Sequence, residues 1–597
     1  MRTIVEILEQ QIAAAMSAVT GEENCPAIVK PTADPKFGDY QANGAMGLAK
    51  RLKTNPRRVA EQVVAKLDLR DICESPDIAG PGFINLRLSP GFLSDRLLET
   101  RADPIRLGIE AVSTPQTIVV DFSSPNVAKQ MHVGHLRSTI IGDSICRMLE
   151  FEGHRVIRQN HIGDWGTQFG MLIQHLFEQA SFLKDDKHLE TFNKAMDEIE
   201  ISDLESFYRE AKSQFDLDET FRRQSRKRVV ELQSGDEASR VVWKKIASES
   251  RRHYQPIYNA LSVRLTEADE CGESFYNDML APLVQDLQER GLARLSDGAI
   301  CVFPEGFVNK EGDPLPFIIQ KSDGGFLYAT TDLAANRYRS ETLRADAIVY
   351  VTDARQKLHF EMLFHTVRAA RWTDREVDLA HVTFGTVLGA DGTPLKTRSG
   401  DSIKLKDLLD EAVARAGEVV EQKSSELPAE QKAAIARAVG IGAVKYADYS
   451  NNRTSDYVFD FDKMLAMEGN TAPYMQYAYA RVQSIGRKAA GKGIDVDGDL
   501  AGLSRVHLAE PEELELAKHL VRYGDTIKGA LVDYRPNYLT TYLYELAQKF
   551  SRFYASCPVL AADDEQRPSR LLLCDLTART IKHGLTQLLG IEVVEQM

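Results

Sequence analysis

The sequence predicts an α/β protein, in which a doubly wound parallel sheet forms the central domain, with an α+β domain before it and an all-α helical bundle after it. Residues 117–120 have an apolar strand pattern, which is followed by a helical pattern and a second strand pattern at 155–158. Strand and helix patterns then alternate to about residue 400, and the remainder is almost entirely helical. Alternating strands and helices indicate a parallel sheet, whereas sustained 3.6-residue periodicity indicates a bundle.

The composition is that of an ordinary soluble protein with several domains. The chain has 597 residues, 43% of them hydrophobic and 27% charged, which suits three or four domains. Its net charge of −14 and pI near 5.5 argue against a generally basic nucleic-acid-binding surface. Any RNA contact must therefore use local basic patches, of which 50–58 and 222–228 are candidates, although each also suits a solvated helix face.

The spacing of the cysteines and the length of the apolar runs indicate whether to expect structural zinc and where in the cell the protein is located. Seven cysteines are scattered without a Cys-x-x-Cys pair, so we expect reduced thiols and no structural zinc. No apolar run approaches the length of about 18 residues that a membrane span needs. We therefore expect a cytoplasmic protein without membrane contact.

Residues 1–112 form the predicted α+β domain. They open with an amphipathic helix whose apolar side includes Ile4, Ile7, Leu8 and Ile12. Residues 83–88 then alternate apolar and polar side chains, as a half-buried strand does. Thr114-Pro115 separates this domain from the central one.

The first strand of the central domain leads into the most informative stretch of the chain. The run Ile118–Val120 ends in a Ser-Pro-Asn break, and His132, Gly134 and His135 lie in the first turn of the helix that follows. A helix start offers free N–H groups and the positive end of the dipole, which favour phosphate. Gly134 leaves room for a ligand to approach the backbone.

This stretch resembles the HIGH signature of class I aminoacyl-tRNA synthetases. Its flanks, 122–126, Ala128-Lys129 and 135–139, resemble the arginyl-tRNA synthetase version. The resemblance implies a Rossmann-like catalytic domain at 113–462 that uses ATP with Mg²⁺ and no dedicated protein metal site. It also implies an arginine–tRNA ligase, which forms arginyl-adenylate and transfers arginine to the 2′-hydroxyl of the terminal adenosine of its tRNA.

The second half of the sheet supplies further predicted site residues. The Gly-spaced loop at 160–168 follows the second strand, and a charged helical insertion at about 180–275 separates the two halves. Near 324–336 the pattern predicts a strand and then a helix opened by Thr331 or Asp332. Residues 348–351 form a predicted buried strand, and 381–388 form another.

A basic loop follows the last of these strands. Asp391-Gly392 predicts a turn into a segment that carries Lys396 and Arg398. Its position resembles that of the class I KMSKS loop, whose cations bind the phosphates of ATP. Ser399 stands where that motif has its second lysine, and Lys129 resembles the substitute cation of some arginyl enzymes.

The resemblance assigns the remaining site residues. Selecting arginine requires carboxylate and amide oxygens around a planar cation with five donors, and Asp332, with Tyr328 and Gln356 nearby, offers them. Residues matched to the backbone end of the substrate are Ser124, Pro125, Asn126 and His135. Asp121 is a weaker candidate because a strand end also suits a structural acid. In the first domain, Phe83 and Asn85 match an aromatic and an amide that contact tRNA, although a buried Phe and a turn-forming Asn are equally compatible with the sequence.

The last domain, 463–597, is predicted to be a helical bundle. One apolar stripe consists of Leu539, Tyr542, Leu543, Leu546, Ala547, Phe550 and Phe553. Residues 457–481 resemble the entry to the anticodon-binding domain of the family. We expect a monomer with tRNA, L-arginine and ATP as partners. Two alternatives stay open: a catalytically silent synthetase-like RNA-binding protein, and a class I synthetase for another amino acid.

Overall fold

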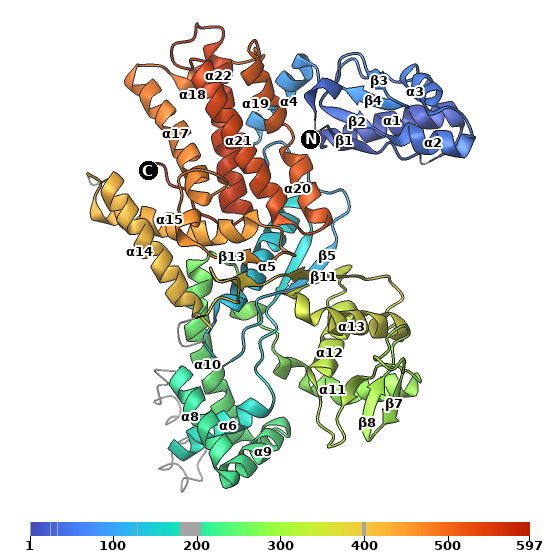
Figure 1. Ribbon diagram of the computed structural model, residues 1–597, viewed down its shortest axis with the longest axis vertical. Coiled ribbons are helices and arrows are strands. Elements are labelled where there is room, and N and C mark those ends of the chain that lie inside the picture. Colours follow the sequence, from blue (N-terminus) through green and yellow to red (C-terminus); the bar gives the residue numbers. More distant parts are fainter. Residues whose placement is uncertain are drawn as a thin grey trace.

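The protein is described by a computed structural model, which covers residues 2–23, 25–32, 34–127, 129–179, 204–396, 402–424 and 426–597. Figure 1 shows the parallel sheet at the centre, the N-terminal α+β part beside the C-terminal helices, and two further groups of elements on the opposite side of the sheet. Within the described ranges, no helix combines the length and the apolar character needed to cross a lipid bilayer.

The N-terminal part is a four-stranded antiparallel sheet packed against helices. Its strand order is β1-β2-β4-β3. The predicted opening helix is confirmed, since Ile4, Leu8 and Ile12 of α1 are fully buried. Its elements are α1 (Ile4–Thr20), β1 (Val29–Pro31), η1 (Pro35–Phe37), β2 (Tyr40–Ala42), α2 (Gly44–Leu52), α3 (Pro56–Val64), β3 (Asp77–Ala79), β4 (Phe83–Leu86) and α4 (Pro90–Ala102).

Strand β4 differs from the expected alternation of buried and exposed side chains. Ile84, Asn85 and Leu86 are all buried, and Phe83 is half-buried. Asn85 is accommodated because its Oδ1 accepts a hydrogen bond from Gln41 Nε2 at 2.8 Å. It lies in the middle of a sheet and is not a turn residue, because β4 pairs on both sides.

The central sheet has the order β11-β10-β5-β6, and its strands all run parallel, so the doubly wound prediction is confirmed. Alternate side chains of one strand enter different cores. Val120 and Val349 pack with α5, whereas Val119 and Ile348 pack with α11, α12 and α13. The strands are β5 (Thr117–Asp121), β6 (Arg155–Gln159), β10 (Ala347–Asp353) and β11 (Asp378–Phe384).

Helices cover both faces of this sheet and form the insertion between its halves. The described insertion, 204–260, is helical as predicted, whereas 180–203 lie outside the described residues. A three-stranded antiparallel sheet, β7-β8-β9, precedes α12. The elements are α5 (Val133–Glu152), α6 (Thr167–Gln179), α8 (Leu204–Leu217), α9 (Glu219–Gln233), α10 (Glu237–Ala260), η3 (Glu267–Asp269), η4 (Glu273–Tyr276), α11 (Asn277–Glu289), β7 (Ala293–Ser296), β8 (Ala299–Val302), β9 (Phe317–Gln320), α12 (Tyr328–Glu341), η5 (Ala354–Gln356) and α13 (Lys357–Ala370).

Three predicted boundaries were wrong. The strand expected near residue 324 lies earlier, since β9 spans Phe317–Gln320. Helix α12 begins at Tyr328, so Thr331 and Asp332 lie within its first turns and do not cap it; Leu327 occupies the cap position. The strand predicted at 381–388 is two strands, because the chain leaves the central sheet after β11 and forms β12 (Val387–Leu388). Strand β12 pairs with β13 (Tyr457–Val458), far along the chain.

From Leu405 onward the described chain is helical apart from the short strand β13, as predicted. The whole apolar stripe on α21 is buried, from Leu539 to Phe553. The helices are α14 (Leu405–Lys423), α15 (Ala429–Ser450), α16 (Phe461–Met464), α17 (Ala472–Gly491), α18 (Val496–Ala501), α19 (Pro511–Leu520), α20 (Tyr523–Val532), α21 (Pro536–Ser556) and α22 (Arg567–Lys582), the last continued by a π-helical turn, His583–Leu588.

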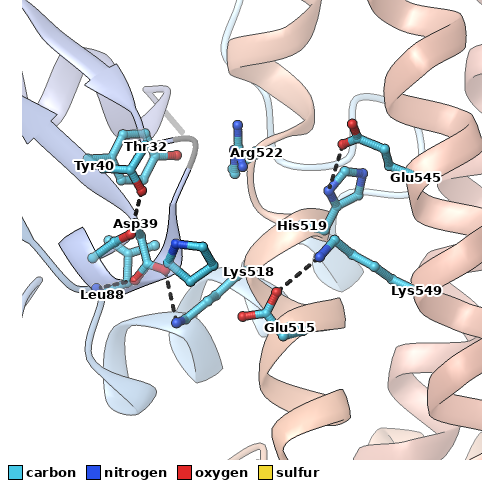
Figure 2. Close-up of a pocket in the computed structure, with 12 residues that line it drawn as sticks. Thr32, Asp39, Tyr40, Leu88, Glu515, Lys518, His519, Arg522, Glu545 and Lys549 are labelled. Atoms are coloured by element: carbon cyan, nitrogen blue, oxygen red, sulfur yellow. Dashed lines mark hydrogen bonds and ion pairs between the residues drawn. The ribbon is translucent and has the colours of Figure 1, made fainter.

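A polar interface joins the N-terminal part to these helices and encloses a hollow of about 310 Å³. Figure 2 shows Asp39 pointing at Lys518, 2.9 Å away, and Glu515 pointing at Lys549, 3.0 Å away. Tyr40 donates to Asp525 at 3.1 Å beneath them. Because most charges of the hollow are paired across or along the interface, they fasten the two parts together.

Candidate active site

The strand order defines the place where a ligand binds. The chain moves from β5 through α5 to β6 on one side, and from β10 through α13 to β11 on the other, so the winding reverses between β5 and β10. In open α/β sheets, ligands bind beyond the carboxyl ends of the strands at such a switch point. The loops after β5, β6 and β10 contain Ser124, His161 and Gln356 respectively.

The loop after β5 is held in a strained conformation. Ser123 and Ser124 have φ values of 74° and 49°, in the left-handed region that residues with a Cβ rarely adopt. Their backbone N–H groups donate to Ser138 Oγ at 2.9 Å and to Asn160 Oδ1 at 3.0 Å. Such strain costs on the order of 1–3 kcal/mol per residue and clusters at functional sites. Ser124 is half-buried at the switch point.

The next two residues continue this loop. Pro125 offers its carbonyl to the N–H of Gly163 at 3.1 Å, and Val127 donates in return to Gly163 O at the same distance. Asn126 between them is exposed. A Cβ on Gly163 would lie 2.5 Å from Asn126 Oδ1, so the glycine allows the loops after β5 and β6 to touch.

The two signature histidines form the start of α5. His132 is the N-cap, and its Nδ1 accepts from the N–H of Gly134 at 3.1 Å. His135 Nδ1 accepts from the N–H of His132 at 3.2 Å, and the two rings are 4.1 Å apart. A Cβ on Gly134 would lie 2.8 Å from the His132 ring, which explains the glycine. The sequence therefore placed His132, Gly134 and His135 correctly at one helix start.

Both imidazoles are neutral near pH 7. Burial, followed by the nearby His132 ring, lowers the pKa of His135 to about 4. Burial and the cation of Lys129 lower the pKa of His132. A neutral imidazole that accepts a backbone N–H through Nδ1 carries its proton on Nε2, which remains a donor.

The basic loop reaches the same helix start through the backbone. Val133 donates to Ile403 O at 2.9 Å, and Leu405 donates to Met131 O at 2.9 Å. On the N-terminal side of the loop, Lys396 is exposed and its backbone pairs with that of Ser402. The loop and the signature are thus neighbours in space. Arg398 and Ser399 lie outside the described residues, and with them one of the predicted cations.

Lys129 has a different contact from the one expected. Its Nζ lies 4.8 Å from the centre of the Tyr208 ring of α8, in a cation–π contact, and the side chain is exposed. Such a contact at an exposed site is worth about 0.5–1 kcal/mol. It is therefore weak enough to exchange for a phosphate contact.

Helices α12 and α13 and the turn before α13 carry the residues predicted to bind arginine. Asp332 Oδ2 lies 2.6 Å from Nε2 of His359, and Oδ1 lies 3.9 Å from Nε2 of His161. Burial opposes ionisation of Asp332, but the hydrogen bond from His359 and the charges of His161 and Arg339 outweigh it, so its pKa is lowered. The ring of Tyr328 lies 5.1 Å from that of His359 and is 64% exposed. Gln356 is exposed at the start of α13.

Glu273 is a second acid in the neighbourhood of Asp332, and it was not predicted from the sequence. Burial, and then the carboxylates of Asp164 and Asp332, raise the pKa of Glu273 to about 7. It belongs to the Gly272-Glu273-Ser274 turn at the end of the insertion, and that turn is held because Ser274 donates to Asp164. A strongly perturbed carboxyl beside a second acid is typical of a functional site. The signal in the sequence was only a short Gly-containing turn at a predicted boundary.

The carboxylate of Asp121 is already paired with a side chain of the protein. Its Oδ2 accepts from Nη2 of Arg339 at 2.7 Å, and both side chains are buried. Asp121 therefore belongs to the buried framework beneath Asp332, whereas the side chains of Asp332 and Glu273 are only partly buried. Across the described ranges, no three His, Cys, Asp or Glu side chains are grouped as metal ligands.

A separate hollow of about 460 Å³ lies among the C-terminal helices. Arg481 of α17 stacks on the Tyr554 ring of α21, 4.7 Å from its centre, and Tyr477 is 42% exposed beside them. Arg487 and Lys488 add two cations to the lining, which also contains Glu426 and Met597. Exposed aromatic rings next to cations are what unpaired nucleobases stack on.

Comparison with family models first defines the class. The catalytic domain of the class I (R) tRNA synthetases matches residues 105–461, the arginyl tRNA synthetase N-terminal domain matches 6–88, and the DALR anticodon-binding domain matches 475–597. The protein is thus a class I tRNA synthetase.

Whole-chain relatives then define the family. The arginine–tRNA ligase of a Synechococcus species is 52% identical and that of Hahella chejuensis 50% identical, each over 99% of both chains. The crystal structure of arginyl-tRNA synthetase from Plasmodium falciparum has a TM-score of 0.85 at 31% identity over 100% of both chains. That of Thermus thermophilus shares the fold, with a TM-score of 0.78 at 24% identity, also over 100% of both chains. The chain belongs to the arginyl-tRNA synthetase family, so the resemblance seen in the sequence is confirmed.

Proposed function

We propose that the residues gathered at the switch point carry out both steps of the arginine–tRNA ligase reaction. The carboxylate of L-arginine attacks the α-phosphate of ATP, which forms arginyl-adenylate and releases pyrophosphate. The 2′-hydroxyl of the terminal adenosine of tRNA then attacks the activated carbonyl and releases AMP. Positioning and charge neutralisation supply most of the catalysis in such in-line transfers.

The start of α5 and the basic loop form the ATP side. His132 and His135 donate through Nε2 to the phosphates, and the exposed backbone at Gly134 allows them to approach. Lys129, Lys396 and Arg398 neutralise the negative charge that develops on the leaving pyrophosphate. Mg²⁺ enters as a companion of ATP and binds through the phosphates and water, as is usual for this ion.

The pocket between α12 and α13 selects the guanidinium group. Asp332 and Glu273 accept its N–H donors, and Tyr328 and Gln356 close the mouth. His359 stabilises the ionised form of Asp332 through the 2.6 Å contact. The strained loop, with Ser124, Pro125 and Asn126, and His135 hold the α-amino and carboxylate end of the substrate. A lysine side chain offers a point charge instead of a planar fork and would satisfy only one of the two acids.

Two more surfaces bind tRNA. Phe83 of β4, which is half-buried, contacts its outer corner, and the buried Asn85 joins this contact by exchanging its hydrogen bond with Gln41. The hollow lined by Tyr477, Arg481 and Tyr554 takes a base of the anticodon. The corresponding domains are 1–112 for the outer corner, 113–462 for catalysis and 463–597 for the anticodon. The enzyme acts as a cytoplasmic monomer.

The observation that carries this function is the pair of acids, Asp332 and Glu273, at the switch point beside the two-histidine helix start. ATP–pyrophosphate exchange with a panel of amino acids, with and without tRNA, tests it. Exchange with arginine alone supports the proposal. Exchange with another amino acid indicates a different specificity, and no exchange under any condition indicates a catalytically silent RNA-binding protein.

A further inference from the structure

Arg339 is a fully buried arginine beneath the arginine pocket. It lies on α12, seven residues after Asp332, and its exposed fraction is 0%. Seven residues are almost two helical turns, so both side chains project from the same face of α12. Asp332 lies near the mouth of the pocket, and Arg339 is directed toward the sheet below it.

The guanidinium of Arg339 contacts three neighbouring strands at one level. In the register of the sheet, Asp121 pairs with Gln159 on β6 and with Tyr350 on β10. Arg339 donates from Nη2 to Asp121 Oδ2 at 2.7 Å and from Nε to Gln159 Oε1 at 2.5 Å. Its guanidinium carbon lies 5.2 Å from the centre of the Tyr350 ring. One side chain therefore fixes α12 to three of the four strands of the sheet at one level, or rung.

This rung is the level at which the substrate loops begin. The other carboxylate oxygen of Asp121, Oδ1, accepts a hydrogen bond from Ser124 Oγ at 3.3 Å. Asn160 follows Gln159 directly, and its Oδ1 accepts the N–H of Ser124. The residues proposed for the two ends of the substrate, Asp332 and Ser124, are thus linked through Arg339 and Asp121.

We propose that Arg339 is a positioning residue for arginine recognition: it sets the separation between Asp332 on α12 and the Ser124 loop after β5. This inference rests on the proposed function of the pocket. A planar fork with several donors can hold two acceptors and an aromatic face simultaneously, which a lysine ammonium cannot. By pairing with Asp121, Arg339 also removes a carboxylate that would otherwise compete for the substrate guanidinium.

The first test compares Arg339→Lys, Arg339→Met and the matched control Arg337→Met. Arg337 lies on the same helix and makes a surface ion pair with Glu341 at 3.0 Å. Displacement of a binding group by about 1 Å can cost 10²-fold, so Arg339→Met should raise the KM for arginine by at least about tenfold. The KM for ATP should change by less than about twofold because the start of α5 is not attached to α12 through this rung. Arg339→Lys should lie between, and Arg337→Met should match the wild type.

The double variant Asp121→Asn with Arg339→Met separates positioning from folding. Arg339→Met alone leaves a buried carboxylate unpaired and should lower the melting temperature, and neutralising Asp121 should recover much of that loss. The KM for arginine should stay raised in the double variant, since α12 is still not fixed to the rung. A wild-type KM for arginine in the double variant, or an equal rise in the KM for ATP, overturns the inference. Asp332→Asn is measured in parallel: unchanged arginine binding in that variant overturns the proposed pocket instead.

Discussion

His359 of α13 holds Asp332 of α12 through a 2.6 Å contact between Nε2 and Oδ2, with both side chains less than one-fifth exposed. Oδ2 is therefore committed to His359, and Oδ1 lies 3.9 Å from Nε2 of His161. The contact joins two helices that flank β10, and it keeps the acid ionised in spite of its burial. A pre-ionised carboxylate of fixed orientation suits a cationic substrate that is planar and directional.

Asp332→Asn should weaken the recognition of arginine while preserving the shape of the side chain. Truncating one partner of a buried, hydrogen-bonded charge pair costs about 2–5 kcal/mol, so arginine affinity should fall roughly thirtyfold or more. ATP affinity should stay near that of the wild type. Isothermal titration with each substrate measures both, and Asp374→Asn, at an exposed acid between α13 and β11, is a suitable control. Unchanged arginine binding would remove Asp332 from the specificity site.

Glu273 should make arginine binding dependent on pH. Its pKa in the empty pocket is about 7, and a guanidinium partner favours the ionised form, so the free enzyme holds more protons than the complex below pH 7. Arginine affinity should therefore rise with pH toward 7, by about tenfold per unit at the steepest, and level off above about pH 8. Titrations at pH 6 in two buffers of different ionisation enthalpy should show the release of nearly one proton. Glu273→Gln should abolish that release, and release that persists in this variant would assign the proton to another group.

The fold was predictable because its signals are local. Strand and helix periodicity defined β5, α5 and β10, and the short Ser-Pro-Asn break located the switch-point loop. The boundary at Tyr328 was missed because the helix start has no Ser, Thr, Asp or Asn at its cap, so Thr331 and Asp332 looked like the cap instead. The end of β11, where the chain leaves the sheet at Gly385, was not predicted because β12 pairs with a strand far along the chain.

The candidate site was predictable only where a motif marks it. The start of α5 concentrates His132, Gly134 and His135 within four residues. Glu273 has no such marker: it reaches the pocket because the insertion folds back, and because Gly272 packs where a Cβ would lie 2.5 Å from Asp164. The role of Arg339 was equally hidden, since a helical arginine in sequence suggests a surface residue.

His132→Ala and His135→Ala should each slow adenylate formation without unfolding the protein. Both rings lie at the N-terminus of α5, and removing one donor to a developing oxyanion typically costs about 10²–10³-fold. Single-turnover ATP–pyrophosphate chemistry measures the effect, with His365→Ala on the exposed side of α13 as control. His135 has a pKa of about 4, so the rate should show no ionisation of this residue between pH 6 and 8. A wild-type rate in either folded variant would exclude that histidine from catalysis.

Tyr477→Ala should weaken tRNA binding without changing the rate of arginine activation once the tRNA is bound. Stacking of a base on an aromatic side chain is worth about 1–3 kcal/mol, which corresponds to a roughly five- to hundredfold loss of tRNA affinity. Filter binding at fixed salt measures the affinity, and exchange at saturating tRNA measures the chemistry. Tyr538→Ala, an exposed tyrosine of α21 outside this hollow, is the matched control. Equal affinities for Tyr477→Ala and Tyr538→Ala would place the anticodon contact elsewhere.

Lys129→Ala should depress adenylate formation strongly if Lys129 replaces the lysine that Ser399 displaces from the basic loop. Its cation–π contact with Tyr208 is worth about 0.5–1 kcal/mol, less than a charge-assisted phosphate contact, so ATP should attract the ammonium away from the ring. Adding Ser399→Lys to Lys129→Ala should recover part of the loss, because a point charge returns from the loop that is hydrogen-bonded to Met131 and Val133. Single-turnover measurements at saturating tRNA separate the rate of adenylate formation from tRNA binding. Tyr208→Leu tests whether the contact between Lys129 and the Tyr208 ring affects that rate. A normal rate in Lys129→Ala would make Lys129 a surface residue, whereas a severe defect without recovery would keep its importance and reject the compensation by Ser399→Lys.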